Sequence, residues 1–458
     1  MNFKAIISRQ REYFRSGATR GLDFRRAQLL KLADLLESNE GELLAALYAD
    51  LRKSPHEAYA AEIGFVLGEI RCAVRHLSGW MKPEGRRSPL LAWPASSHIH
   101  SEPYGLALII GSWNYPLQLL LSPLVGAIAA GNCAILKPSE FAPSTAKVLE
   151  QLIRANYPED YLTVIQGERE TSAALLRERF DSIFFTGGTE TGRVVMAAAA
   201  RHLTPVTLEL GGKCPCIVSH DAPVETTARR IVWGKFMNAG QTCIAPDHVW
   251  VDRRIAVELL GSMKKALVEF YGEFPQQCPD YGRIVNRRHL DRLEGYLKEG
   301  NIVCGGESVA ADLYMAPTIL TDVPWASPVM TEEIFGPVLP MIEFGDIGEV
   351  LENLHDRPKP LALYLFTNDR ILQERVLAET QSGGVCINDT ILQILGHDLP
   401  FGGVGESGMG NYHGRASFDG FSHRRVVMRR RFAWDSKFRY PPPGVPLSVF
   451  KRLLRFLG

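Results

Sequence analysis

The apolar residues of the N-terminal region recur at a helical spacing. Between Arg25 and Trp80 they fall three or four positions apart, and no proline occurs before Pro55. The first repeat contains Leu29, Leu30, Leu32, Ala33, Leu35 and Leu36, with Asp34 and Glu37 among them. Because this spacing places an apolar stripe along one side of a helix, the pattern predicts helices that cover a face of the core.

From Gly105 onward, short apolar runs alternate with helical patterns. Strands are predicted at residues 106–110, 133–136, 162–165, 182–185 and 206–210. Helices are predicted between them at residues 117–130, 144–156, 170–178 and 190–200. Alternating strands and helices predict a parallel sheet with right-handed crossovers, which is the arrangement of a doubly wound nucleotide-binding domain.

A second α/β region is predicted from about residue 213 to residue 401. Its candidate strands include residues 215–218, 248–251, 317–320, 363–366 and 384–388. The stretch 82–102 is different, because it is rich in proline and then alternates in polarity through Ser97-His98-Ile99-His100-Ser101. This stretch is expected to form an extended excursion with an edge strand.

The C-terminal tail begins with a stiff Pro441-Pro442-Pro443 linker. After it, apolar residues recur at a helical spacing, with basic residues on the opposite side. The apolar set is Val449, Phe450, Leu453, Leu454 and Leu457, and the basic set is Lys451, Arg452 and Arg455. The pattern predicts a short basic amphipathic helix, which would be marginal alone in water. Packing on the protein's own surface is the preferred interpretation, and contact with an anionic membrane is the alternative.

Composition excludes several classes of protein. A chain of 458 residues is expected to form two or three domains, and its 51 basic and 51 acidic residues provide no overall field for nucleic acid. Eight scattered cysteines and an N-terminus without a signal-peptide pattern predict a reducing, cytoplasmic location. Residues 103–136 carry no charge and could span a bilayer, but glycine, proline and asparagine interrupt them. This punctuation favours buried strand, turn and helix.

Cys243 is the candidate nucleophile. It follows Gly240-Gln241-Thr242, and a helix is predicted after Gly240. At a helix N-terminus the dipole would favour the thiolate, and the Cys243 N–H would point at a bound substrate oxygen. The ordinary alternative for any lone cysteine is a small buried apolar residue.

Two further residues lie where a predicted strand ends. Glu209 precedes Gly211-Gly212, and burial there would raise its pKa toward that of a general base. Asn114 follows the first predicted strand, and its amide could donate to a developing oxyanion. The alternatives are a hydrogen-bonded carboxylate in a turn for Glu209 and an ordinary turn asparagine for Asn114.

Two segments are candidates for binding a nucleotide. Residues Gly187-Gly188-Thr189-Glu190-Thr191-Gly192 connect a strand to a helix, where glycine allows close approach and the helix start favours phosphate. Lys137 and Glu140 follow another strand and could bind ribose hydroxyls. The alternative for the second segment is helix capping by Ser139 or Ser144.

These motifs together, in this order, resemble the aldehyde dehydrogenase family over nearly the full length of the chain. Further matching runs are Glu332-Glu333-Ile334-Phe335-Gly336-Pro337-Val338 and Pro400-Phe401-Gly402-Gly403. The class 3 group within the family is the most similar. Its resemblance is carried by Tyr281-Gly282-Arg283-Ile284, Lys359-Pro360-Leu361-Ala362-Leu363-Tyr364, Gly408-Met409-Gly410, Tyr412-His413-Gly414 and Phe421-Ser422-His423-Arg424-Arg425.

The resemblance implies a mechanism. Cys243 would attack an aromatic or a medium- to long-chain aliphatic aldehyde, Asn114 would stabilise the oxyanion, and Glu209 would activate the water that hydrolyses the thioester. NAD is the expected cofactor, with NADP possible. The residues expected to bind it are Trp113, Lys137, Glu140, Gly187, Gly188, Thr189, Gly192, Leu210, Gly211, Glu333 and Phe335. Gly188 departs from the serine found in many relatives.

The resemblance also implies the architecture: a Rossmann-type cofactor domain, an α/β catalytic domain and a small bridging β element. The implied boundaries are 1–81 and 104–208 for the cofactor domain, 209–410 for the catalytic domain, 82–103 and 411–432 for the bridging element, and 433–458 for the tail. A homodimer is expected and a metal is not. In similar fatty aldehyde dehydrogenases an extra C-terminal helix covers the substrate tunnel, which gives the tail a third possible role.

The same residues distinguish a hydrolytic dehydrogenase from other functions. Glu209 argues against a CoA-acylating enzyme, because it supplies a base for water. The presence of Cys243, Glu209 and Asn114 argues against a catalytically silent protein, and the motif around Glu333 argues against a cysteine hydrolase. Tyr115, Trp233, Met237 and Ile391 are the candidates for the substrate pocket. His413 is expected to be a packed or surface histidine rather than a gate.

Overall fold

The predicted apolar stripe near the N-terminus folds into a helical layer. The structure is a computed structural model that describes residues 3–89, 92–432, 435, 440–442 and 444–457. The layer contains α1 (Phe3–Arg15), α2 (Leu22–Ser38), α3 (Glu40–Leu51), α4 (Pro55–Ala58), a π-helical turn η2 (Tyr59–Ile63) and α5 (Gly64–Trp80). Leu29, Leu32 and Leu36 are buried, whereas Leu30 is exposed, so one side of α2 faces the core.

The first sheet has six strands in the order β17-β7-β6-β3-β4-β5. They are β3 (Leu106–Ile110), β4 (Cys133–Lys137), β5 (Leu162–Val164), β6 (Ser182–Thr186), β7 (Val206–Glu209) and β17 (Gly408–Met409). All neighbours run parallel except β17 and β7. The helices between the parallel strands are α6 (Gln118–Ala130), α7 (Pro143–Asn156), α8 (Arg169–Leu175) and α9 (Thr189–Ala200). The doubly wound sheet predicted from the sequence is confirmed.

The order of these strands fixes where a ligand can bind. The chain passes from β3 to β4 and β5 on one side, then returns to β6 and β7 on the other side of β3. In such sheets the crevice lies at the carboxyl ends of the two strands where the order reverses. These ends lead directly to Asn114, which follows β3, and to Gly187 and Gly188, which follow β6.

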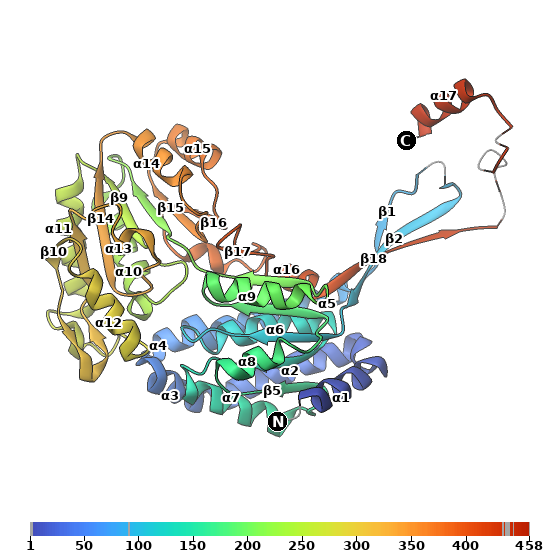
Figure 1. The fold of residues 1–458 in the computed structure, drawn as a ribbon, viewed down its shortest axis with the longest axis horizontal. Helices are drawn as coiled ribbons and strands as arrows, with labels where there is room; N and C mark the ends of the chain where they lie inside the picture. The colour runs from blue at the N-terminus through green and yellow to red at the C-terminus, as the bar shows by residue number, and fades with distance from the viewer. Residues whose placement is uncertain (1–2, 90–91, 433–434, 436–439, 443, 458) are drawn as a thin grey trace.

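The second sheet has seven strands in the order β10-β13-β14-β9-β8-β15-β16. They are β8 (Pro215–Val218), β9 (His248–Asp252), β10 (Asn301–Cys304), β13 (Thr318–Thr321), β14 (Val338–Phe344), β15 (Ala362–Phe366) and β16 (Gly384–Ile387). Its helices are α10 (Val224–Phe236), α11 (Ala256–Tyr271), α12 (Arg287–Tyr296), α13 (Pro328–Thr331), α14 (Ile347–His355) and α15 (Arg370–Glu379). In Figure 1 this unit lies beside the first sheet and its helices.

A three-stranded antiparallel sheet projects away from these two units (Figure 1). It consists of β1 (Glu84–Arg86), β2 (Ala95–Pro103) and β18 (Ser422–Arg430), which follows α16 (Gly414–Gly420). β2 is the central strand, with β1 on one side and β18 on the other. The predicted stretch thus contains an edge strand, β1, but its alternating segment around Ile99 belongs to the central strand, because β18, far along the chain, pairs with β2 from Pro103 to Ala95.

The predicted tail helix is present as α17 (Leu447–Leu457). It lies beyond the far end of the three-stranded sheet, away from the two larger units (Figure 1). Three of its apolar side chains are exposed to solvent, Leu447 at 66%, Val449 at 45% and Leu454 at 39%, and Phe450 is partly buried. Packing of this helix on its own chain was the preferred interpretation, and the structure contradicts it. Leu453 and Leu457 of the predicted apolar set lie outside the described side chains.

The uncharged stretch 103–136 folds as β3, the buried helix α6 and the start of β4. This outcome agrees with the interpretation as buried strand, turn and helix. Among the described helices, none is both long and apolar enough to cross a membrane. The domain boundaries given above are kept as a proposal.

Candidate active site

Cys243 lies on the loop that follows α10. The short 3₁₀ turn η4 (Met237–Gly240) precedes it, with Asn238 and Ala239 in the left-handed region at φ 52° and 51°. Gly240 has φ 76°, and a β-carbon there would lie 2.2 Å from the Gly336 carbonyl oxygen. Only glycine fits this position without moving the backbone.

No helix follows Gly240. Residues 241–247 form turns that lead into β9, so Cys243 is not at a helix N-terminus and the helix-dipole argument for its thiolate was wrong. The Gln241 side chain holds the loop instead. It donates to the carbonyls of Asn238 at 3.0 Å and Arg283 at 2.9 Å, and its oxygen accepts the Val285 N–H at 3.0 Å.

The electrostatic environment keeps Cys243 protonated in the free protein. Burial raises the pKa of the thiol well above its ordinary value, and the negative charges of Glu333 and Glu209 raise it further. The backbone N–H groups of Cys243 and Ile244 donate toward the sulfur and oppose this shift. The thiol therefore needs a proton acceptor before it can attack a carbonyl carbon.

Asn114 is attached to the cysteine loop. It follows β3, is 2% exposed, and its side-chain Nδ2 donates to the Gln241 carbonyl at 3.0 Å. The next residue, Tyr115, makes a hydroxyl–hydroxyl hydrogen bond of 2.7 Å with Thr242, directly before the cysteine. Asn114 is therefore more than an ordinary turn residue, because its side chain joins the segment after β3 to the loop of Cys243.

Glu209 ends β7 and is 2% exposed. Neither of its carboxylate oxygens has a hydrogen-bond partner among the described residues. Burial raises the pKa of this carboxyl well above its ordinary value. The alternative of a hydrogen-bonded carboxylate in a turn is thus wrong, and Glu209 has the buried, free carboxylate that a general base requires.

Glu333 brings a second, partly buried carboxylate to the site. Burial first, and then the charge of Asp247, raises its pKa to about 8, while the Gly212 N–H donates to it and lowers the pKa. A β-carbon at Gly211 would lie 2.0 Å from Glu333 Oε2, so glycine is required where this side chain crosses the strand end. Sequence reasoning identified both Glu333 and Gly211.

An aromatic cluster flanks Glu333. Phe335, at φ 46°, packs edge-on against Trp113 with ring centroids 5.2 Å apart, and His289 lies 5.2 Å from Trp113 on another side. Arg292 holds the loop by donating to the Glu333 carbonyl at 3.3 Å and the Ile334 carbonyl at 2.8 Å. His289 and Arg292 were not predicted, because they lie on α12, far along the chain from Trp113.

A cleft of about 350 Å³ opens between the two large units beside Glu333. Three predicted residues, Thr189, Gly211 and Glu333, line it. The remaining lining residues were not predicted: Gly212, Lys213, Thr331, Leu354, Arg357, Pro358, Lys359, Pro360 and Glu406. These residues come from both units. A local sequence pattern therefore cannot predict that they line one cleft.

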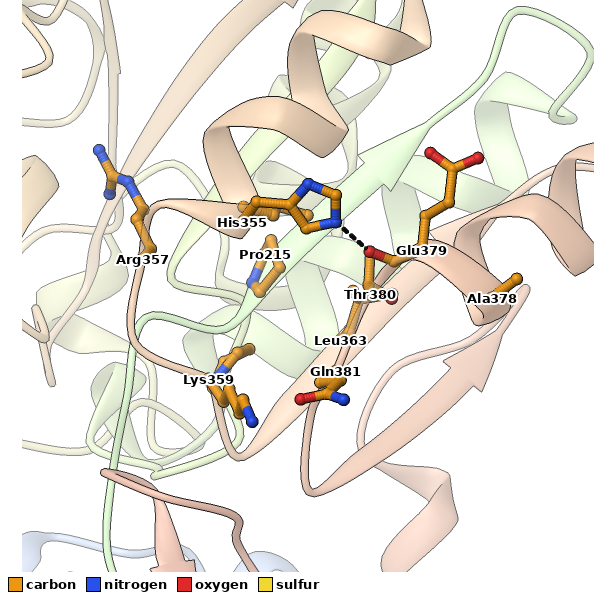
Figure 2. A pocket seen from close by; sticks show the side chains of 11 residues that line it. Pro215, His355, Arg357, Lys359, Leu363, Ala378, Glu379, Thr380 and Gln381 are labelled. Atoms are coloured by element: carbon orange, nitrogen blue, oxygen red, sulfur yellow. Dashed lines mark hydrogen bonds between the residues drawn. The ribbon is translucent and has the colours of Figure 1, made fainter.

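A second cavity of about 340 Å³ adjoins the cleft and shares Leu354, Arg357, Lys359 and Pro360 with it. Figure 2 shows its lining between α14 and the end of α15, with the His355 ring directed at the Glu379 carbonyl. That contact is a 2.5 Å hydrogen bond through His355 Nε2. None of the predicted site residues lines this second cavity.

The turn after β6 has the shape of a phosphate cradle. Gly188 caps α9 without a side chain, and a β-carbon there would meet nothing within 4 Å, so the helix start is open. Gly187 and Gly192 instead pack tightly, against Phe185 and Leu210. The Thr189 hydroxyl donates to the Glu406 carbonyl at 3.1 Å. Room at Gly188, together with the carboxylate of Glu333 in the lining of the cleft, fits a dinucleotide.

Lys137 and Glu140 form an ion pair of 3.6 Å after β4. Lys137 is 1% exposed, burial lowers its pKa, and its ammonium donates to the Pro138 carbonyl at 2.7 Å. The capping alternative is wrong for this segment. Asp50 of α3 caps α7 by accepting from the N–H groups of Ser144 at 3.0 Å and Thr145 at 2.8 Å.

The remaining sequence candidates are distributed unevenly. Tyr115 and Ile391 are buried, Met237 is partly buried, and Trp233 is 40% exposed. His413 is a packed histidine, as expected, 3.2 Å from Glu69 and 1% exposed. Cys214 packs beneath the site, where its Sγ donates to the Cys243 carbonyl at 3.4 Å. Within the described part of the chain, no three histidine, cysteine or acidic side chains are grouped to hold a metal.

Comparisons with known proteins agree with this geometry. A model described as "Aldehyde dehydrogenase family" matches residues 1–427. Aldehyde dehydrogenase family 3 member B1 of Bos taurus is 47% identical over 96% of this chain and 94% of its own length. The Canis lupus familiaris protein named "Aldehyde dehydrogenase, dimeric NADP-preferring" is 47% identical over 95% and 97%. The solved structure of Staphylococcus aureus AldH in a substrate-bound state is 43% identical, covers 99% of this chain and 100% of that chain, and has a TM-score of 0.97.

Proposed function

The chain belongs to the aldehyde dehydrogenase family, and we propose that Cys243 is its nucleophile, Glu209 its general base and Asn114 its oxyanion donor. Its relatives are class 3 enzymes, and the chain is an NAD(P)-dependent aldehyde dehydrogenase that oxidises aldehydes to carboxylic acids. One observation supports the residue roles above the others. The charges of two carboxylates, the buried Glu209 and the partly buried Glu333, act on the thiol of Cys243.

In the first step, the Cys243 thiol loses its proton to water, the thiolate Sγ bonds to the carbonyl carbon of the aldehyde, and the carbonyl oxygen becomes an oxyanion. The Asn114 amide and the Cys243 N–H donate to this oxyanion, which lowers the barrier most where water is excluded. Asn114 Nδ2 already donates one hydrogen to the Gln241 carbonyl, so its second hydrogen is the one for substrate.

The cofactor, when bound, supplies the hydride acceptor that oxidises the carbon attached to Cys243. Glu333 and Phe335 would hold its nicotinamide half, with Trp113 packed behind Phe335. Lys137 and Glu140 would hold the adenosine ribose, and the turn from Gly187 to Gly192 would face the phosphates. Leu210 and Gly211 would complete the floor of the site.

In the last step, Glu209 takes a proton from water, and the resulting hydroxide attacks the thioester carbon. The Cys243 thiolate leaves and the acid is released. Burial raises the pKa of Glu209, which makes it a stronger base than an exposed glutamate. A CoA-acylating enzyme would not need this base, so Glu209 favours hydrolysis.

An activity assay tests this function. With NAD, we expect NADH to form from benzaldehyde and from a medium-chain aliphatic aldehyde, without added CoA. NADP should also support turnover, at lower efficiency, because the Glu140 carboxylate would repel a 2′-phosphate. Turnover only after CoA is added would contradict the hydrolytic role of Glu209, and no turnover with either cofactor would contradict the proposal as a whole.

We also propose that the enzyme is a cytoplasmic homodimer whose tail contacts the surface of an anionic membrane. The printed name of the canine relative, "dimeric", supports the first part. Charge supports the second, because residues 421–458 contain ten Lys or Arg and a single acidic residue, Asp435, although the whole chain has no net charge. The exposed Leu447, Val449 and Leu454 of α17 give this basic segment an apolar face.

Deletion of the tail tests the membrane contact. The full chain should co-sediment with vesicles that contain anionic lipid, and a chain truncated after Tyr440 should lose most of this binding. High salt should weaken the binding of the full chain, because the interaction is partly electrostatic. Neutral vesicles are the lipid control. The truncated chain should oxidise aldehydes at the rate of the full chain, which controls for its folding. Equal sedimentation of both chains would contradict a role for α17.

A further inference from the structure

A buried ion pair lies directly behind the segment that carries Asn114. Lys53 is on the connection between α3 and α4, and Glu62 is in the π-helical turn η2. Both side chains are completely shielded from solvent, and Lys53 Nζ donates to Glu62 Oε1. Single π-helical turns of this kind are often retained where a side chain must be placed for function.

The Lys53 ammonium makes two further contacts, both with the Asn114-Tyr115 segment. It donates to the Asn114 carbonyl at 2.7 Å, and it lies 3.8 Å from the centre of the Tyr115 ring. A cation this close to an aromatic face is attracted by the ring, more strongly when both are shielded from water. One ammonium thus binds the backbone of Asn114 and the side chain of Tyr115 together.

Glu62 fixes the next part of the same segment. Its second oxygen accepts from the N–H groups of Leu117 at 2.8 Å and Gln118 at 3.2 Å, which are the first groups of α6. A carboxylate at this position satisfies donors that the helix itself leaves unpaired. The ion pair therefore holds the segment from Asn114 to Gln118 at both ends.

The opposite side of this segment contacts the cysteine loop. The Asn114 carbonyl also accepts from Asn238 Nδ2 at 2.8 Å, and the Tyr115 hydroxyl is bonded to Thr242. Any shift of Lys53 would thus reach both the oxyanion donor and the residue before the nucleophile. No other described lysine lies within hydrogen-bond distance of the Asn114 carbonyl.

We propose that Lys53 and Glu62 are positioning residues that hold Asn114 and Tyr115 against the Cys243 loop, so that the oxyanion donor is in place when the thiol attacks. This inference rests on the proposed function of Asn114. Stability alone does not explain the pair, because a buried ion pair is often no more stabilising than two apolar side chains of the same size. The position of Asn114 explains the pair better, because displacing an oxyanion donor by about 1 Å can lower the rate on the order of 100-fold.

A set of five variants, with Asn114→Ala as the fifth, tests the proposal. Lys53→Met and Glu62→Gln each leave one buried partner unmatched and should lower the melting temperature. The double variant Lys53→Met/Glu62→Gln removes both charges and keeps an acceptor for α6, so its melting temperature should return toward that of the wild type. Its first-turnover rate of NADH formation should nevertheless remain about 10- to 100-fold low, with a much smaller change in KM.

The fourth variant combines Lys53→Met with Asn114→Ala. If Lys53 acts through Asn114, the combination should lose no more first-turnover rate than Asn114→Ala alone. Additive losses, or recovery of the rate together with the melting temperature in the Lys53/Glu62 double variant, would overturn the proposal. An Asn114→Ala variant with a normal first turnover would instead contradict the proposed oxyanion role itself, so the two failures are distinguishable.

Arg25→Met is the matched control. Arg25 is also a buried cation, 4% exposed, and it also donates to a backbone carbonyl, that of Ala129 at 3.0 Å. That carbonyl lies at the far end of α6 from Leu117. The control should lower the melting temperature and leave the first-turnover rate at the wild-type value. A comparable loss of rate in Arg25→Met would mean that the effect of Lys53 is one of general stability.

Discussion

Replacing Cys243 with alanine should abolish NADH formation from every aldehyde tested, with a loss of at least about 1,000-fold in kcat/KM. The loss should be this large because no other group can form the covalent bond. Cys214, the thiol that donates to the Cys243 carbonyl, is completely buried, and burial raises its pKa well above the ordinary value. Initial rates of NADH formation provide the measurement.

The fold of this variant should be unchanged. Cys243 is only partly buried and the substitution removes a single sulfur atom, so the melting temperature should fall by no more than a few degrees. Cys304→Ala, on the outermost strand of the seven-stranded sheet, is the matched control and should retain full activity. Substantial turnover by Cys243→Ala would remove the thioester from the mechanism.

The strands around the site could be predicted because their burial is visible in the sequence. β3 and β8 are completely buried apolar runs, and both were predicted with the bounds that they have in the structure. A run of this kind, bounded by glycine, proline or asparagine, has few alternatives to a central parallel strand. The order of the strands then placed Asn114, Glu209 and the Gly187 turn at one edge of the sheet.

The loop of Cys243 could not be predicted, because distant residues determine it. Its left-handed residues Asn238 and Ala239 would be unfavourable in isolation. They are held by bonds from Gln241 to Arg283 and Val285, and by the close approach of Gly336 to Gly240. Arg283, Val285 and Gly336 each lie more than 40 residues along the chain from the loop residue that they contact. A local helix prediction at Gly240 therefore failed, and Cys243 stays the proposed nucleophile on other grounds.

Partners that are distant in the sequence also explain why the position of β2 and the buried ion pair were not predicted. β2 looked like an edge strand because its neighbourhood is rich in proline, but the partner that makes it central, β18, comes more than 300 residues later. The ion pair of Lys53 and Glu62 also escaped prediction. Charged residues in a helical region are usually solvated, and nothing local to them reveals that α6 and the Asn114 segment cover both.

Replacing Glu209 with glutamine should separate the two halves of the reaction. The first turnover should still release about one NADH per active site, because thioester formation needs Cys243 and Asn114. Steady-state turnover should then fall by about 100- to 10,000-fold, since no base remains to activate water. Rapid mixing would show a burst followed by a slow phase, and intact-protein mass spectrometry would show the acyl adduct on Cys243. A first turnover that falls as far as the steady state would place Glu209 before the thioester and contradict its role in hydrolysis.

The pH dependence gives a second readout of the same assignment. Burial raises the pKa of Glu209, and only the ionised carboxylate can accept a proton from water. Steady-state turnover of the wild type should therefore decline as pH falls through this raised pKa, where the protonated enzyme behaves like Glu209→Gln. Glutamine does not titrate, so the slow phase of the variant should lack this acid limb, and a limb that persisted would belong to another group. The burst depends on ionisation of Cys243 and not on Glu209. Its pH dependence should therefore be nearly the same in the wild type and in Glu209→Gln. A small difference is expected, because the charge of Glu209 raises the pKa of the thiol.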